Sequence, residues 1–443
     1  MNWGKIEKWL FYILVFLIPF QAKAVLYSFR ADFNEWTSIF LYLTDIFVLA
    51  LLALWLPRIF KQKGGKRPDS EKKPAGTILA IFLIIAAISL FFTENLRLGF
   101  YEFVKLLEFA ALFLYVRYNF SRFYNLEKLW QVFIASALLQ SIVAIIQFFI
   151  QKSIGLKFFE SPLGPDIAGV AKLVIDEENI IRAYGLTPHP NILAIILILA
   201  IFGLALLFIR QYGGLSLRRK IIFGAIFILI SWALFLTFSR VAIIVGLISF
   251  ILWLALLYRM GHERKAVIIV FTSLFIVFCL LTIIYQTYIF NRFDPGSITE
   301  GQDYQLRVLY NKIALDFIKG HPIFGVGHGN FVWTISSYSF MKPWMWQPVH
   351  NIYLLIAAEI GVVGLLVFLW FLYLIIEGFF KRKNRNNFDK LSVYCLLFVI
   401  FTLLIVGLFD HLLWDIQTGQ IILWLFLGIL ASYSFSGIAK KSL

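Results

Sequence analysis

Charged residues are scarce in this chain of 443 residues: Asp, Glu, Lys and Arg make up 15% of it, against about 25% in a typical soluble domain. Cysteine is scarcer still, because Cys279 and Cys395 are the only two, and both lie in long apolar runs. Two such residues indicate neither a disulfide framework nor a metal-ligand pair. The basic segment 57–76 reads as a polar linker without a phosphate-binding glycine motif, so it offers no nucleotide site.

Apolar residues are abundant instead. They account for 61% of the chain, with 48 Phe and 13 Trp, and the mean hydropathy is +0.84. A transmembrane helix needs about 20 such residues. We therefore predict an all-α integral membrane protein, a single polytopic domain over residues 1–443. Its twelve predicted spans are 9–27, 37–56, 77–93, 99–116, 129–150, 189–209, 220–237, 241–258, 266–286, 352–376, 391–409 and 418–434.

The distribution of charge predicts the orientation of these spans. If the N-terminus is cytoplasmic, more than half of the 40 Lys and Arg residues fall in cytoplasmic loops or tails, whereas few of the 25 acidic residues do. Basic residues favour the cytoplasmic side, so both termini are predicted in the cytoplasm of a cell-membrane protein. The net charge of +15 is then an orientation signal rather than a nucleic-acid site, because the basic residues are scattered over separate loops.

The first apolar stretch also has features of a signal peptide. Lys5 and Lys8 precede it, and the sequence from Ala22 to Ala24 resembles a cleavage site. The run is longer than an ordinary signal core, and further spans follow it. We expect a retained helix, and the predicted orientation is the same in either case.

Two longer segments face the outside in this topology, 151–188 and 287–351. Within the larger one, the apolar stripe through residues 306–317 predicts an amphipathic helix over 304–319. Asp303 is its expected N-cap, and Gly320 is its expected end. Because the cytoplasmic loops are short and featureless, we expect chemistry or recognition on the outer face.

Several ionisable residues lie inside predicted spans, where charge is expensive and is a functional candidate by default. Glu102, Lys105 and Glu108 lie three residues apart on one helix face, so mutual neutralisation explains them as well as a site would. Asp45 and Glu359 are equally consistent with polar contacts between helices.

Three outer arginines are candidate anion ligands. Arg240 begins a span, where it could also extend to the lipid headgroups. Arg307 falls in the first turn of the predicted helix, where the macrodipole disfavours a cation, so either pairing with Asp303 or an anion beside it would explain the position. Arg182 shares the same face of the membrane.

His350 stands where the large outer segment enters a span. A partly desolvated imidazole there suits a general base, although a lone histidine in a loop is more often merely polar. The segment 320–331 contains His321, His328 and three alternating glycines. Gly325 and Gly327 permit tight turns, with a phosphate-binding nest as the alternative.

The remaining histidines and carboxylates do not suggest a metal. His189 precedes the span that begins near Asn191 and is a candidate helix cap. Asp410 and His411 lie near the outer end of a span. No set of His, Cys and carboxylates has the tight spacing of a ligand set, so neither a metal nor a cofactor is predicted.

Taken together, these motifs resemble the O-antigen ligase and O-antigen polymerase superfamily, the Wzy/WaaL-type membrane proteins. The resemblance extends over the chain and is specific over 236–364, within a ligase-like core at 236–434. The similar sequences are TPHPNILA at 187–194, LTFSR at 236–240, RVLYNKIALDFIKGHPIFGVGHGNF at 307–331, PVHNIYLLIAAEIGVVG at 348–364 and FDHLLW at 409–414.

The resemblance implies a GT-C-like, metal-independent inverting glycosyltransferase. Such enzymes move a glycan from an undecaprenyl-diphosphate carrier to an acceptor sugar hydroxyl on the outer face of the membrane, with a second glycan or lipid A-core as acceptor. It implies His350 as the base and Arg240, Arg307 and Arg182 as diphosphate ligands. The implied supporting residues are Asn351, Tyr310, Asp410, His411, Gly325 and Gly327.

The sequence leaves the acceptor, and so the choice between ligase and polymerase, open. It also leaves the oligomeric state open. A lipid-linked glycan exporter is the main alternative function, but it would place charges along a path at mid-membrane. A scaffold without activity would leave the candidate residues apart in space.

Overall fold

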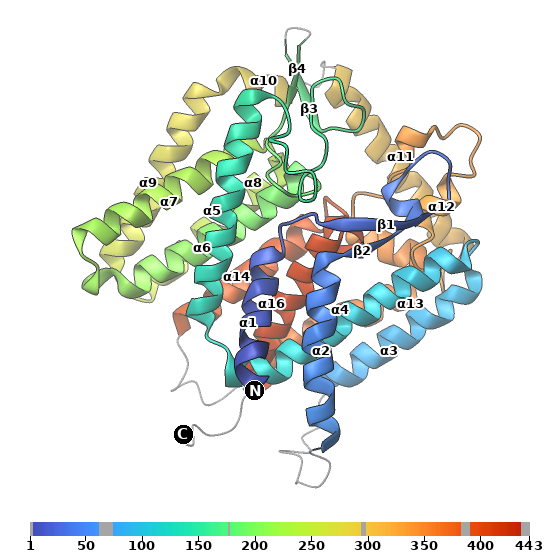
Figure 1. Ribbon diagram of the computed structural model, residues 1–443, viewed down its shortest axis with the longest axis horizontal. Helices are drawn as coiled ribbons and strands as arrows, with labels where there is room; N and C mark the ends of the chain where they lie inside the picture. Colours follow the sequence, from blue (N-terminus) through green and yellow to red (C-terminus); the bar gives the residue numbers. More distant parts are fainter. Residues whose placement is uncertain (1–2, 62–73, 176–177, 294–297, 382–389, 436–443) are drawn as a thin grey trace.

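The computed structural model describes residues 3–61, 74–175, 178–293, 298–381 and 390–435, and these carry every structural statement below. The chain is mostly helical (Figure 1). Its first elements are α1 (Trp3–Leu17), β1 (Lys23–Ser28), η1 (Glu35–Thr37), β2 (Ser38–Tyr42), α2 (Leu43–Lys61), α3 (Pro74–Ser89), η3 (Leu90–Phe92), α4 (Leu96–Phe123) and α5 (Leu126–Ile150). The others are β3 (Lys172–Ile175), β4 (Glu178–Ile181), α6 (Pro190–Gln211), η4 (Tyr212–Gly214), α7 (Leu217–Leu236), α8 (Arg240–Arg259), α9 (Arg264–Ile284), α10 (Gln286–Phe293), α11 (Ile298–Gly320), α12 (Phe331–Ile335), η5 (Pro343–Met345), α13 (Ile352–Phe380), α14 (Lys390–Val406), α15 (Leu412–Asp415) and α16 (Gln417–Phe435).

All twelve predicted stretches contain a helix. Among the described residues, seven helices are long and apolar enough to cross a membrane: α3 with η3, α5, α6 with η4, α7, α8, α9 and α13. The other five stretches contain α1, α2, α4, α14 and α16. The structure therefore supports a multi-pass membrane protein with seven candidate spans, and twelve spans remain a prediction.

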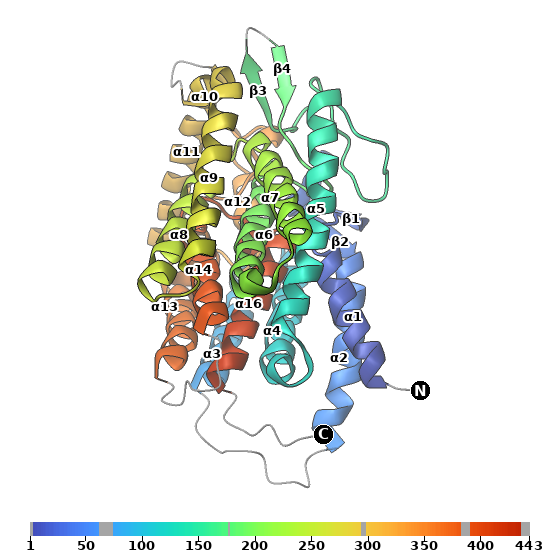
Figure 2. The same cartoon turned by 90° about the vertical axis from the view of Figure 1, so that its left-hand side faces the viewer.

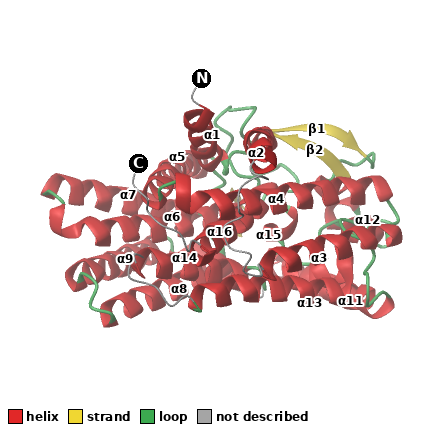
Figure 3. Cartoon of the chain, turned by 90° about the horizontal axis from the view of Figure 1, so that it is seen from below, coloured by secondary structure: helices red, strands yellow, loops and turns green. Residues whose placement is uncertain are grey.

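The core of the bundle is α6, in which every residue from 192 to 209 is buried. Helices α5, α7, α8 and α14 pack around it. Figure 3 shows α6, α14 and α16 in the middle, with α7 and α9 on one side and α11 to α13 on the other. The outward faces of α7, α8 and α9 expose large apolar side chains, including Ile228, Ile248 and Phe275, as a lipid-facing surface requires.

The predicted first span is wrong beyond its first half, and the all-α class needs correction. Helix α1 ends at Leu17, because Pro19 cannot continue the hydrogen-bond ladder and disfavours a helical residue before it. The chain then forms β1, which pairs antiparallel with β2, so α2 starts at Leu43 rather than at 37. Strands β3 and β4 form a second short hairpin.

The two predicted outer segments lie toward one end of the bundle. Strands β3 and β4 stand at the end opposite the start of α1 (Figure 2). Segment 287–351 contains α11, which ends at Gly320 as predicted but begins at Ile298 rather than 304. Asp303 is therefore inside the helix and is not its N-cap. Of the predicted linker 57–76, residues 62–73 lie outside the described part.

Helix α13 is broken in its first half, which the sequence did not predict. Gly361 has φ +84° and ψ 167° within an otherwise helical run. A β-carbon there would lie 2.0 Å from Ile323 O, so a glycine is required for this close approach. Val362 N, on the far side of the break, donates to Pro322 O (2.8 Å). The break is thus built around the segment 320–331.

Gly325 and Gly327 belong to this packing. Both are buried and have positive φ angles, +68° and +94°. A β-carbon on Gly325 would lie 2.4 Å from Ala358 O, and one on Gly327 would lie 2.2 Å from Thr93 Cγ2. Glycine is therefore needed at both positions because the chain makes tight turns there against α13 and η3.

The charged residues in the predicted spans divide into two groups. Lys105 Nζ lies 2.6 Å from Asp45 Oδ1 and 2.7 Å from Glu108 Oε2. Gln417 Nε2 also donates to Asp45 Oδ1, at 2.5 Å, so this buried group joins α2, α4 and α16. The predicted pairing within α4 therefore includes Lys105 and Glu108 but not Glu102, which lies in a separate pocket, and Asp45 makes the predicted polar contact between helices.

Candidate active site

The five-residue segment 407–411, which links α14 to α15, is where distant elements meet. Gly407 O accepts a hydrogen bond from the backbone N–H of Ile352, the first residue of α13 (2.8 Å). Leu408 O accepts from Asn351 Nδ2 (3.0 Å), and Phe409 O accepts from Arg307 Nη1 (3.2 Å). Its last two residues, Asp410 and His411, are ionisable. The segment therefore holds α11 and the start of α13 around a titratable pair.

Asn191, at the start of α6, connects Asp410 to the turn that precedes Arg240. Asn191 Nδ2 donates to Asp410 Oδ2, and Asn191 Oδ1 accepts from Arg182 Nη2, both at 2.8 Å. Arg182 Nε donates to Thr237 O (2.7 Å) in that turn, and Arg240 begins α8 three residues later. This chain of hydrogen bonds fixes the start of α8 relative to the 407–411 segment.

His350 lies next to Asn351, the N-cap of α13, and packs between two rings. Its imidazole is nearly parallel to the ring of Tyr310, at 6.0 Å between centroids, and perpendicular to that of His411, at 4.9 Å. Its Nδ1 is buried, and no described residue forms a hydrogen bond with it. Burial and then the positive charge of His411 hold the pKa of His350 well below its usual value. The imidazole is therefore neutral near pH 7 and can accept a proton.

The pKa of His411 is shifted in the opposite direction to that of His350. His411 Nδ1 lies 2.7 Å from Asp415 Oδ1, and its Nε2 lies 3.9 Å from Asp410 Oδ1. Burial alone would lower the pKa of His411, but the two carboxylates raise it overall. Burial would likewise raise the pKa of Asp410, but His411, then His350 and Arg307, lower it. Two neighbouring imidazoles whose pKa values are shifted in opposite directions are an arrangement typical of acid–base sites.

Arg307 reaches this cluster from the middle of its helix. Because α11 begins at Ile298, the argument that placed Arg307 beside a helix N-terminus is wrong. Its guanidinium instead bonds to Phe409 O, and its positive charge lowers the pKa of both His350 and Asp410. Arg307 is only partly buried, so a ligand can approach it.

Two other predicted residues hold this geometry in place. Asn351 Oδ1 caps α13 by accepting from the backbone N–H groups of Tyr353 (2.9 Å) and Leu354 (3.0 Å). Tyr310 is buried, and its hydroxyl donates to Met345 O (2.8 Å). Each contact fixes a residue that lies next to His350, and a supporting function for Asn351 and Tyr310 stays a prediction.

The other histidines lie outside this cluster of rings or serve the fold. His189 caps α6, since its Nδ1 accepts from Asn191 N (3.2 Å). His321 is exposed at the end of α11. Within the described ranges, no three His, Cys, Asp or Glu residues are grouped so as to hold a metal ion.

Sequence reasoning missed three residues of this site. Asn191 entered the sequence analysis only as the start of a span, beside the candidate cap His189, and Asp415 did not enter it. Trp36, whose ring lies 5.6 Å from that of His411, gave no signal at all. It comes from η1, far from His411 along the chain, and only the fold brings them together.

A comparison with known families identifies part of the chain. Residues 225–369 match the family model described as O-antigen ligase. The match begins within α7 and ends within α13, so it includes Arg240, Arg307 and His350 but not Arg182, Asp410 or His411. No curated protein matches the chain. The match supports the resemblance inferred from the sequence, and residues 225–369 are similar to the O-antigen ligase family.

Proposed function

We propose that this chain is a glycosyltransferase that moves a glycan from an undecaprenyl-diphosphate carrier to an acceptor sugar hydroxyl, at the outer face of the cytoplasmic membrane. The O-antigen ligase match supports the reaction class. The proposed architecture is a GT-C-like bundle of twelve spans, with both termini in the cytoplasm. The excess of basic residues in the predicted cytoplasmic loops supports this orientation.

In the proposed reaction, the acceptor hydroxyl attacks the anomeric carbon of the donor. The bond from that carbon to the diphosphate oxygen breaks, and the diphosphate leaves with the electron pair. The proton of the hydroxyl passes to His350. A single displacement inverts the anomeric centre, and the carrier linkage supplies the energy, so ATP is not required.

Negative charge grows on the diphosphate as it leaves. Arg307 and Arg240 are the proposed ligands for that charge, because guanidinium groups bind phosphate oxygens in a bidentate manner. Arg182 is the third candidate. Its bonds to Thr237 and Asn191 favour a contribution through the position of the Arg240 turn. At a partly dehydrated site such contacts stabilise a transition state strongly.

One observation carries this proposal: a neutral imidazole and a guanidinium meet at the same five-residue segment. His350 contacts His411, and Arg307 bonds to Phe409 O. A base and an anion ligand must be adjacent for this reaction, because the attacked carbon lies between the hydroxyl and the diphosphate.

The test is reconstitution of the purified chain with an undecaprenyl-diphosphate glycan and separate candidate acceptors. We expect transfer by the wild type, and His350→Ala should abolish it while the unfolding temperature stays unchanged. One addition per acceptor indicates a ligase, and a ladder of products indicates a polymerase. Movement of the donor across sealed vesicles without any product would indicate an exporter and would refute the proposal.

A further inference from the structure

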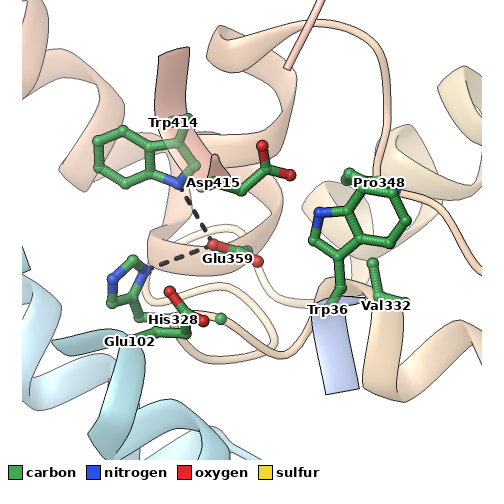
Figure 4. A pocket seen from close by; sticks show the side chains of 9 residues that line it. Trp36, Glu102, His328, Val332, Pro348, Glu359, Trp414 and Asp415 are labelled. Atoms are coloured by element: carbon green, nitrogen blue, oxygen red, sulfur yellow. Dashed lines mark hydrogen bonds and ion pairs between the residues drawn. The ribbon is translucent and has the colours of Figure 1, made fainter. Parts of the chain in front are cut away.

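A small polar pocket is lined by Asp415, the residue whose carboxylate contacts His411. It is lined by Glu102 from α4, His328 from segment 320–331, Glu359 from α13, and Trp414 and Asp415 from α15. Trp36, Gly329, Val332 and Pro348 complete its wall (Figure 4). The space open to the centre of a water molecule is about 20 Å³, enough for one or two waters.

Polar atoms without partners surround this space. Asp415 Oδ2 and Trp36 Nε1 are buried and form no hydrogen bond with any described residue. His328 is 5% exposed, and its Nδ1 is also buried without a hydrogen bond to any described residue. A carboxylate oxygen, Glu359 Oε2, lies 3.4 Å from this nitrogen. Buried polar groups are costly unless they are bonded. One acceptor and at least one donor at a water-sized space fit bound water.

The pocket connects to the reacting centre through a single carboxylate. Asp415 Oδ1 holds His411 Nδ1 at 2.7 Å, and its other oxygen belongs to the pocket. His411 in turn contacts the ring of His350. Figure 4 shows the Asp415 carboxylate beside Glu359, with Glu102 and His328 on the opposite side of Glu359. Of the two residues beyond Glu359, Glu102 is partly buried and His328 is buried, so Glu102 is the more open of the two to solvent.

We propose that this pocket holds water and serves as the exit for the proton released in each transfer. This inference rests on the proposed function, which leaves one proton on His350 for every glycosidic bond formed. The proton moves from His350 to Nε2 of a neutral His411, while the Nδ1 proton of His411 passes to Asp415 Oδ1. Water carries it from Asp415 to Glu359 and Glu102, and Glu102 releases it to solvent. His350 is then neutral for the next acceptor.

The surrounding charges favour this direction. The positive charge of Arg307 lowers the pKa of both His350 and His411, so it favours movement of a proton beyond the two imidazoles. Three carboxylates, Asp415, Glu359 and Glu102, stand on the pocket side, with His328 among them. Asp410 also faces His411, but its oxygens already accept from Asn191 and from the His411 backbone N–H.

The experiment compares the first turnover with later turnovers in Glu102→Gln, using rapid quench and the reconstituted donor and acceptor. We expect the first turnover at the wild-type rate and steady-state turnover slowed about 10-fold or more, since positioned proton transfer is worth about 100-fold to 10,000-fold in enzymes. Small buffer acids and bases, such as imidazole, should restore the steady state. Glu178→Gln, at an exposed position on β4, is the control and should behave as wild type.

Two results would overturn the inference. Equal steady-state rates in Glu102→Gln and wild type would mean that the proton leaves by another route, for instance with the diphosphate. A slowed first turnover that buffer does not restore would mean that the pocket is structural. Asp415→Asn serves as a second variant and should also respond to buffer. A wild type inactive with every diphosphate donor would instead refute the proposed function itself.

Discussion

The break in α13 allows a quantitative test of how this site is built. Gly361→Ala places a β-carbon 2.0 Å from Ile323 O, 2.2 Å from the carbon of that carbonyl and 2.6 Å from Phe324 N. All three are backbone atoms, so no side-chain rotation relieves the overlap. The φ of +84° with ψ of 167° is also a conformation that residues other than glycine rarely adopt.

The expected cost follows from these two effects. The strained backbone conformation costs about 1–3 kcal/mol, and the overlap with a packed segment costs about 1–3 kcal/mol more. Together they predict a loss of about 2–6 kcal/mol in the free energy of unfolding. Activity should fall too, because the displaced segment 320–331 carries His328 and abuts Glu359, both of which line the polar pocket that contains Asp415.

The assay is thermal unfolding of the purified protein in detergent, followed by tryptophan fluorescence. Gly224→Ala in α7 is the matched control, because a β-carbon there meets nothing within 4 Å. Alanine is favoured over glycine inside a helix by about 0.5–1 kcal/mol, so the control should be neutral or slightly stabilised. An unfolding temperature for Gly361→Ala equal to that of the wild type would refute the packing described for the break.

Three further outcomes are expected. Arg307→Ala should lower the rate of transfer by about 100-fold or more, and full activity in Arg307→Lys would argue against a bidentate phosphate contact. His411→Asn removes a charge that lowers the pKa of His350, so the acid limb of the pH–rate profile should move to higher pH. Asp410→Asn removes a negative charge that raises the pKa of His350, so the acid limb should move to lower pH. A shift of the acid limb in the same direction in both variants would contradict the charges assigned to His411 and Asp410. EDTA should leave transfer unchanged, whereas a loss restored by Mg²⁺ would contradict a metal-independent reaction.

The helices were predictable because a long apolar run in a membrane protein forms a helix, which satisfies its own backbone hydrogen bonds. Local signals also fixed several ends: His189 caps α6 and Gly320 ends α11. The errors came from signals given too little weight. Pro19 indicates the end of the first helix, and residues 298–303 (ITEGQD) concealed the true start of α11 because they are mostly polar and do not continue the apolar stripe.

The contacts that assemble the site could not be predicted from one sequence. Asn191 and Asp410 are 219 positions apart and meet through one hydrogen bond. The resemblance implied a supporting role for Asp410, but nothing in the sequence indicated that Asn191 is its partner. The break at Gly361 was equally invisible, because a glycine within an apolar run is ordinary, and its reason is the backbone of Ile323 on another segment.

The most direct test of the account is an experimental structure of the chain in a lipid nanodisc with undecaprenyl diphosphate bound. We predict the diphosphate on the side of the bundle where α6, α8 and α13 begin, with its oxygens about 2.7–3.2 Å from the guanidinium nitrogens of Arg240 and Arg307 and with His350 beside it. A diphosphate bound elsewhere, or guanidinium groups of Arg240 and Arg307 directed away from His350, would contradict the proposed active site.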